Sequence, residues 1–178
     1  MKENVFLDSP KEYSLEDYMN HTVNGRGNLG QEVPIEVYRL LEYSLREELE
    51  ERFGKECQVE IMRCAGRRAG IFFARNLLDV TLPLQEFVAQ LQAKTAELKI
   101  GVIRIEKLDE DTGKIVLTVS EDADCSGLPL LGETVCNYDE GFIAGIMSAY
   151  TEKEYRAVEI DCWATGDRVC RFLVEVKE

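Results

Sequence analysis

The spacing of apolar residues predicts helices in the first hundred positions of the chain. A helix is expected between Pro34 and Gly54, because proline is favoured in the first turn of a helix and glycine just beyond its end. One side of this helix is apolar and is expected to pack on the core, whereas the side rich in Glu and Arg, including Glu42 and Arg46, is expected to be solvated. The apolar stripe consists of Val37, Leu41, Leu45, Leu49 and Phe53.

Two more helices are predicted, over about residues 56–78 and after Pro83. The first of them contains Gly66 and Gly70, one turn apart. Glycine inside a helix costs about 1 kcal/mol relative to alanine, so two glycines at this spacing predict the close approach of another backbone or a ligand, most simply a second helix.

From Ile100 the apolar period changes to two, which indicates strands. A first hairpin is expected between residues 100 and 119, a short helix over 140–150, and a second hairpin over 155–176. This order predicts an α+β fold in which an antiparallel sheet of two hairpins, about four strands, is covered on one face by helices.

Residues 1–32 lack this periodicity and are interpreted as an N-terminal arm or dimerisation segment, and residues 33–178 as one domain. The chain has 178 residues, a size typical of a single domain with its own core. Within the arm, residues 24–30 match a Gly-x-Gly-x-x-Gly pattern, but no strand is predicted before it. We therefore interpret it as a loop and not as a dinucleotide site.

The net charge of the chain limits its partners. Lys and Arg number 21 against 34 Asp and Glu, giving −13, which disfavours nucleic acid and anionic membrane surfaces. No signal peptide and no apolar run of about 20 residues is apparent, so a cytoplasmic location is expected.

The cysteines carry the sharpest chemical signal. The chain has six, and in a reducing compartment such residues are read as buried thiols or metal ligands. Cys136, Glu159, Cys162 and Cys170 could converge around a tetrahedral zinc ion, provided that a bulge or strand end places Glu159 and Cys162 on one face. Four protein ligands would make this zinc structural. The alternatives are small buried residues, or a disulfide between Cys162 and Cys170.

The C-terminal third resembles the 4-vinyl reductase domain family, above all in GFIAGIMSAYTEKEYRAVEIDCWATGDRVCRF, residues 141–172. The resemblance implies a fold shared with TRAPP subunits and haem-based nitric oxide sensors, with helices on an antiparallel sheet around an apolar cavity. In the sensor domains of phenol- and xylene-responsive activators, which belong to this family, one Cys upstream and a Glu, Cys, Cys set in the hairpin hold zinc. These roles fall on Cys136, Glu159, Cys162 and Cys170.

Phenol-sensing members of the family use a pocket histidine. The only histidine here, His21, lies in the arm, so neither phenol nor haem is expected as a ligand.

The leading hypothesis is a free-standing domain that binds an apolar, aromatic or hydrocarbon ligand in a cavity between helices and sheet. The glycine pairs Gly66 with Gly70 and Gly141 with Gly145 motivate this cavity, because they remove side-chain volume. The alternative is an enzyme or accessory protein in the reduction of a tetrapyrrole vinyl group, although no nucleophile with a histidine partner is apparent. A homodimer is also expected. The candidate lining residues are Phe72, Phe73, Leu77, Phe142, Ile146, Met147, Tyr150 and Trp163.

Overall fold

The structure, a computed structural model, describes residues 13–20, 30, 32–109 and 112–177. His21 and most of the glycine pattern of residues 24–30 lie outside the described residues. The chain divides into two compact units, residues 1–33 and 34–178. The first contains α1 (Leu15–Asn20), which begins after a cap formed by Ser14: its Oγ accepts a hydrogen bond from the Asp17 N–H at 3.2 Å.

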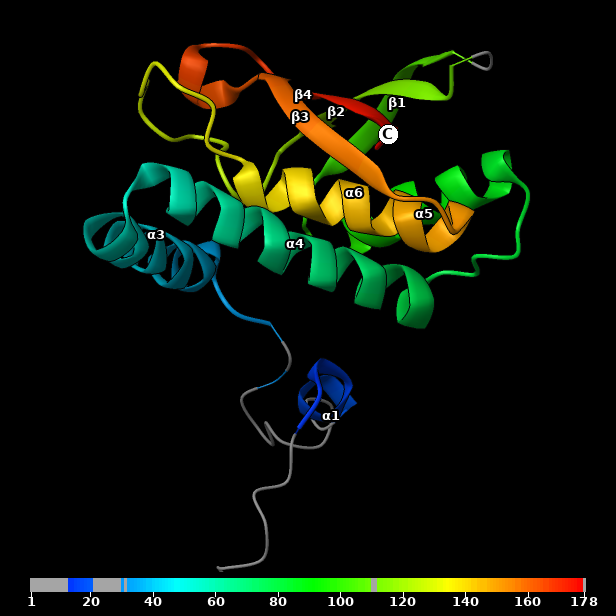
Figure 1. Ribbon diagram of the computed structural model, residues 1–178, viewed down its shortest axis with the longest axis horizontal. Helices are drawn as coiled ribbons and strands as arrows, with labels where there is room; N and C mark the ends of the chain where they lie inside the picture. Colours follow the sequence, from blue (N-terminus) through cyan, green and yellow to red (C-terminus); the bar gives the residue numbers. More distant parts are fainter. Residues whose placement is uncertain (1–12, 21–29, 31, 110–111, 178) are drawn as a thin grey trace, which may run out of the picture. The chain divides into compact units, whose positions relative to one another are not determined.

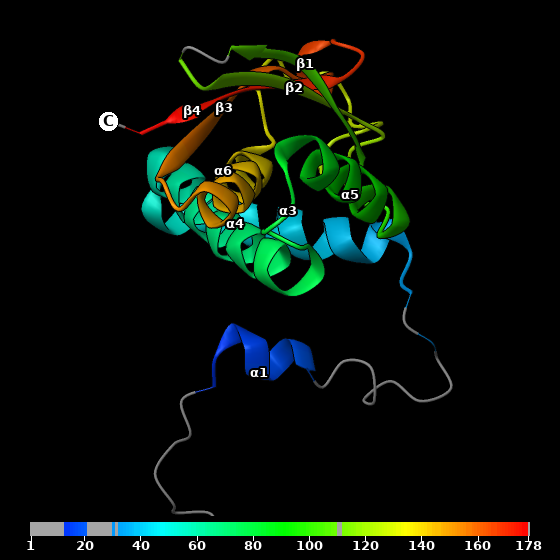
Figure 2. The same cartoon turned by 90° about the vertical axis from the view of Figure 1, so that its right-hand side faces the viewer.

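The second unit is an α+β domain with a four-stranded antiparallel sheet in the order β1-β2-β4-β3. Figures 1 and 2 show its helices on one face of this sheet, which confirms the predicted fold class. Among the described residues, no helix has the length and apolar character needed to cross a membrane. The elements are α3 (Ile35–Phe53), α4 (Lys55–Leu77), α5 (Leu84–Glu97), β1 (Val102–Asp109), β2 (Lys114–Ser120), α6 (Asn137–Thr151), β3 (Tyr155–Asp161), the 3-10 turn η2 (Trp163–Thr165) and β4 (Cys170–Val176).

Helix α6 is the centre of the domain. It lies between the sheet and α4 (Figure 1), and almost all of its first eleven residues are buried. Phe87 of α5, Ile146 of α6 and Phe172 of β4 are among the most deeply buried side chains. The apolar faces that the sequence pattern predicted for α5, α6 and β4 therefore meet in one core.

Helices α4 and α6 cross at the two glycine pairs. A Cβ atom on Gly66 would overlap the carbonyl of Tyr138, and one on Gly145 would overlap the carbonyl of Arg67. The predicted close approach of another helix is thus confirmed. The idea that these glycines open a cavity is wrong, because each is filled by the backbone of the opposite helix.

Helix α3 faces the opposite way from the expectation. Its stripe residues Val37, Leu41 and Phe53 are 52%, 69% and 60% exposed, whereas Glu42 and Arg46 are buried. The helical period was read correctly, but the buried side of the helix contacts other polar groups and not the apolar core. Sequence patterning assumes that apolar positions point inward, and α3 is an exception to this rule.

Candidate metal centre

Four cysteines from four separate segments converge beside the N-terminus of α6. Cys125 lies in the loop between β2 and α6, and Cys136 is the N-cap residue of α6. Cys162 follows β3 and caps η2, and Cys170 is the first residue of β4. All four are buried, all are free thiols, and their sulfur atoms lie within 4.8 Å of one another.

The sulfur separations suit a tetrahedral metal. In a tetrahedron, a Zn–S distance of about 2.3 Å corresponds to sulfurs about 3.8 Å apart. The Cys136 sulfur lies 3.9 Å from that of Cys162 and 3.7 Å from that of Cys170. The Cys125 and Cys170 sulfurs are closer, at 3.1 Å. A metal ion can therefore be accommodated with small movements, chiefly of Cys125.

Cys125 is the ligand candidate that the sequence analysis missed, since the family resemblance gave it no role. The sequence signal was its position in the same loop as Cys136, eleven residues earlier. Spacing within an irregular loop does not show which way a side chain points. The structure thus brings together three of the four predicted ligands and adds Cys125 to them.

Glu159, the fourth predicted ligand, borders this cluster. The β3–β4 register shifts between Glu159 and Asp161, which is the irregularity that a common face for Glu159 and Cys162 required. Glu159 Oε2 accepts a hydrogen bond from the Cys136 N–H at 3.0 Å, while its Oε1 is buried and has no partner among the described residues. Its role as a metal ligand stays a prediction.

The cluster concentrates negative charge. Hydrogen bonds among the thiols, first of all with Cys125, lower the pKa of Cys162 and raise the pKa of Cys136 and Cys170. Burial, followed by the charge of Cys162, raises the pKa of Glu159 to about 8. Cys162 is therefore the sulfur that first carries a negative charge, and the Ala164 N–H donates a hydrogen bond to it at 3.4 Å.

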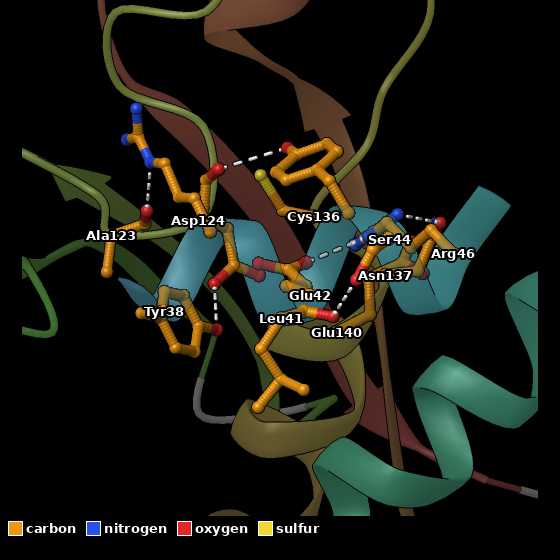
Figure 3. A network of polar contacts seen from close by, with 12 residues as sticks. Tyr38, Leu41, Glu42, Ser44, Arg46, Ala123, Asp124, Cys136, Asn137 and Glu140 are labelled. Atoms are coloured by element: carbon orange, nitrogen blue, oxygen red, sulfur yellow. Dashed lines mark hydrogen bonds and ion pairs between the residues drawn. The ribbon is translucent and has the colours of Figure 1, made fainter. Parts of the chain in front are cut away.

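Helix α3 holds the loop that carries Cys125. The Tyr38 hydroxyl donates to Asp124 Oδ1 at 2.6 Å, and the Tyr43 hydroxyl donates to the Asp124 carbonyl at 3.0 Å (Figure 3). Arg39 Nε donates to the Ala123 carbonyl at 2.8 Å. These bonds explain why the polar side of α3 is buried: it satisfies the backbone of an irregular loop.

An apolar crevice lies between α5, the sheet and α6. Its empty volume is about 420 Å³, part of it open to solvent, and about 20 Å³ of it admits the centre of a water-sized sphere. A ligand of drug-like size needs roughly 300 Å³ or more, so such a ligand requires α5 to move away from the sheet. The lining residues are Leu84, Phe87, Val88, Leu91, Ile103, Ile105, Ile115, Leu117, Ile143, Ile146 and Met147.

Of the predicted ligand contacts, Ile146 and Met147 line this crevice. Tyr150 lies next to it, stacked on Phe87 with ring centroids 4.0 Å apart, and its hydroxyl donates to the Leu82 carbonyl. The structure also reveals the contribution of α5 and β1, which the sequence analysis did not assign to the pocket.

The other predicted contacts lie elsewhere. Phe73 and Phe142 are buried against each other in an edge-on pair, with ring centroids 5.1 Å apart. Phe72 is half-buried, and Leu77 is 40% exposed. Trp163 is 37% exposed on η2, where its indole N–H donates to the Leu128 carbonyl. For these residues, ligand binding stays a prediction.

Comparison with known families places this site in context. Residues 115–176 match the family model of the 4-vinyl reductase (4VR) domain, a stretch that includes β2, the loop with Cys125, α6, β3 and β4. The chain therefore belongs to the 4-vinyl reductase domain family through its C-terminal part, and the resemblance seen in the sequence is confirmed.

Two proteins of Methanocaldococcus jannaschii are similar in sequence. The uncharacterized protein MJ0150 is 25% identical over 165 residues, which are 92% of this chain and 87% of the relative. The uncharacterized protein MJ1642 is 35% identical over 80 residues, which are 45% of this chain and 47% of the relative.

Solved structures share the fold at low sequence identity. A vinyl-4-reductase family protein from Methanocaldococcus jannaschii aligns over 96% of this chain and all of its own, with a TM-score of 0.60 and 12% identity. The phenol-responsive sensory domain of the transcription activator PoxR aligns over 78% of this chain and 73% of its own (TM-score 0.59, 16% identity). Subunit 3 of the trafficking protein particle complex from Naegleria fowleri, covalently bound to palmitic acid, aligns over 81% and 95% (TM-score 0.66, 12% identity).

Proposed function

We propose that this chain is a small-molecule-binding domain in which a structural zinc ion braces the junction of sheet and helices. The observation that carries the proposal is the convergence of four buried sulfurs next to an apolar helix–sheet core. The ligand class that fits the crevice is apolar, either aromatic or hydrocarbon, because every residue that lines it is apolar.

Zinc suits the donor set. Thiolates are soft ligands that select zinc among the abundant divalent ions, and four of them leave no coordination position for substrate. Bound by Cys125, Cys136, Cys162 and Cys170, the ion would tie the β2–α6 loop to α6, β3 and β4. Its chemical contribution is therefore mechanical, and the metal holds the end of the sheet against the central helix.

Two structural neighbours support the ligand class. The PoxR sensory domain was solved with phenol and the trafficking complex subunit with palmitic acid. Both are apolar or aromatic compounds in the same fold. Because the crevice is nearly closed, we propose that the ligand enters by displacing α5, which packs on β1 and the core through apolar side chains.

Native mass spectrometry and metal analysis of reduced, untagged protein test this proposal. We expect one stoichiometric zinc in the cysteine site. Palmitic acid or phenol added to the protein should produce a complex of one ligand per chain. Val88→Phe, which fills the crevice from α5, should weaken binding at least tenfold. Val158→Phe, on the exposed side of β3, should not. Zinc-free protein, or equal binding by both variants, contradicts the proposal.

A homodimer is the second part of the proposal. The specific observation is the outward apolar stripe of α3, with Leu40 and Leu41 exposed by 73% and 69%. A twofold axis would pair this stripe with its copy. We place the protein in the cytoplasm, where four neighbouring thiols remain reduced. The acidic net charge makes nucleic acid and membranes unsuitable partners.

A further inference from the structure

Four carboxylic acids are buried together beside the cysteine cluster. Asp122 and Asp124 lie in the loop after β2, Asp139 lies in the first turn of α6, and Glu42 lies on α3. Their exposed fractions are 2%, 2%, 8% and 6% in that order. Carboxylates are seldom buried to this extent unless they are paired with cations, so each needs a partner.

The arginines nearby do not balance this charge. Arg46 pairs with Glu42 at 2.8 Å, and Arg39 donates to the backbone carbonyls of the loop that contains Asp122 and Asp124. Four carboxylates against two guanidinium groups leave a formal charge of −2 when the acids are ionised. One divalent cation would neutralise it.

Several acid oxygens point into this region without any partner among the described residues. They are Asp122 Oδ2, Asp124 Oδ2 and Glu42 Oε2. The other oxygens are engaged: Asp122 Oδ1 accepts from the Asp124 N–H at 2.7 Å, and Asp124 Oδ1 accepts from Tyr38. Buried polar atoms are nearly always satisfied, so three such oxygens in one place indicate a missing ligand.

The ligand geometry is already formed. One carboxylate oxygen of Asp122, one of Asp139 and the Cys136 sulfur lie within 4.8 Å of one another, and all three residues are buried. Cys136 thus belongs both to the four-sulfur group and to this second group (Figure 3 shows it behind Asp124 and Asn137). Two oxygens and a thiolate form a mixed donor set that suits divalent transition metals such as zinc, manganese or cobalt.

We propose a second divalent metal site, formed by Asp122, Asp139 and the shared thiolate of Cys136, with Asp124 and Glu42 beside it. The chain would then bind two metal ions bridged by one sulfur. Helix α3 covers the second ion with Glu42 and with the tyrosines that hold the loop. This inference goes beyond the structural zinc proposed above, although it shares Cys136 with it.

Metal counting tests the second site. Reduced, untagged protein is loaded with excess Zn²⁺, freed of unbound metal by gel filtration and analysed for metal per chain. We expect two equivalents in the wild type, one in the double variant Asp122→Asn with Asp139→Asn, and two in Asp79→Asn, which alters an exposed aspartate. One equivalent in all three proteins overturns the second site but leaves the structural zinc intact. Two equivalents in the double variant overturn it as well, and no metal in any protein overturns both sites.

A cobalt titration of the wild type tests the bridge without any variant. The first equivalent of Co²⁺ should give the sulfur-to-cobalt absorption of a four-thiolate site. The second equivalent should change this absorption, because Cys136 then binds two ions. If the second equivalent does not bind, or leaves the sulfur-to-cobalt absorption unchanged, the bridged site is overturned whatever the variants do.

Melting temperatures provide an independent sign test. Without metal, replacing buried carboxylates by amides removes mutual repulsion, so the double variant should melt at or above the wild-type temperature. With Zn²⁺ in excess, the wild type should gain more stability than the variant, because it binds one more ion in the folded state. An equal gain in both proteins overturns the proposal.

Discussion

The sulfur atoms of Cys125 and Cys170 lie 3.1 Å apart, although 45 positions separate the two residues in the chain. Cys125 belongs to an irregular loop and Cys170 begins β4, so their contact closes the sulfur cluster from two sides. A bound tetrahedral metal would hold these sulfurs about 3.8 Å apart. This pair therefore distinguishes the four-cysteine set from the set that includes Glu159.

The first prediction concerns this choice of ligand. Cys125→Ser should reduce zinc affinity by more than 100-fold, because it removes a coordinating sulfur. Glu159→Gln should reduce it by about 10- to 100-fold, the usual cost of changing a group that orients a ligand. Competition with a chromophoric chelator measures both affinities. A larger loss for Glu159→Gln than for Cys125→Ser would assign the fourth position to Glu159.

The second prediction concerns the crossing of α4 and α6. Gly70→Ala should destabilise the protein by about 1–3 kcal/mol or more, because the added Cβ overlaps the backbone carbonyl of Phe142 and forces the helices apart. Ala65→Ser, on the exposed side of the same helix, should change stability by less than about 0.5 kcal/mol. Urea denaturation followed by circular dichroism measures both. Similar values would show that the crossing is loosely packed.

The third prediction concerns pH. Burial, and then the charge of Asp124, raises the pKa of Glu42 from 4.5 to about 7. The folded state therefore holds a proton that the unfolded state loses, and this contribution to stability is present below pH 4.5 and is lost as the pH rises through 7. The free energy of unfolding of metal-free protein should fall across this window, and the fall should be smaller in Glu42→Gln. An unchanged slope in this variant would contradict the assignment to Glu42.

The fourth prediction concerns association through α3. Leu40→Glu with Leu41→Glu should raise the dimer dissociation constant at least tenfold, because charges replace apolar side chains in the proposed interface. Leu130→Glu, an equally exposed leucine in the loop before α6, should leave it unchanged. Sedimentation equilibrium measures the constant.

The segment of residues 1–33 is the other candidate to cover α3. A wild-type monomer at micromolar concentration would contradict the dimer. In that case a chain without residues 1–32 that then associates would indicate that this segment occupies the stripe.

The sequence by itself determined the order and type of the elements in residues 34–178. Helical and alternating periods are local properties, so they identified α4, α5, α6 and both hairpins, and the glycine pairs identified a close helix crossing. The motif between Cys136 and Phe172 also identified the family, because ligand residues keep their spacing on a hairpin.

Only the tertiary structure decided which face of α3 is buried and which groups complete the metal centre. The loop of residues 121–136 has no period, so nothing local shows that Cys125 turns toward Cys170 or that Asp122 turns toward Asp139. Unsatisfied carbonyls of that loop then recruit the polar side of α3, and this reverses the rule that apolar residues face inward. Contacts between distant segments, and the need to satisfy buried polar groups, settled what periodicity alone could not.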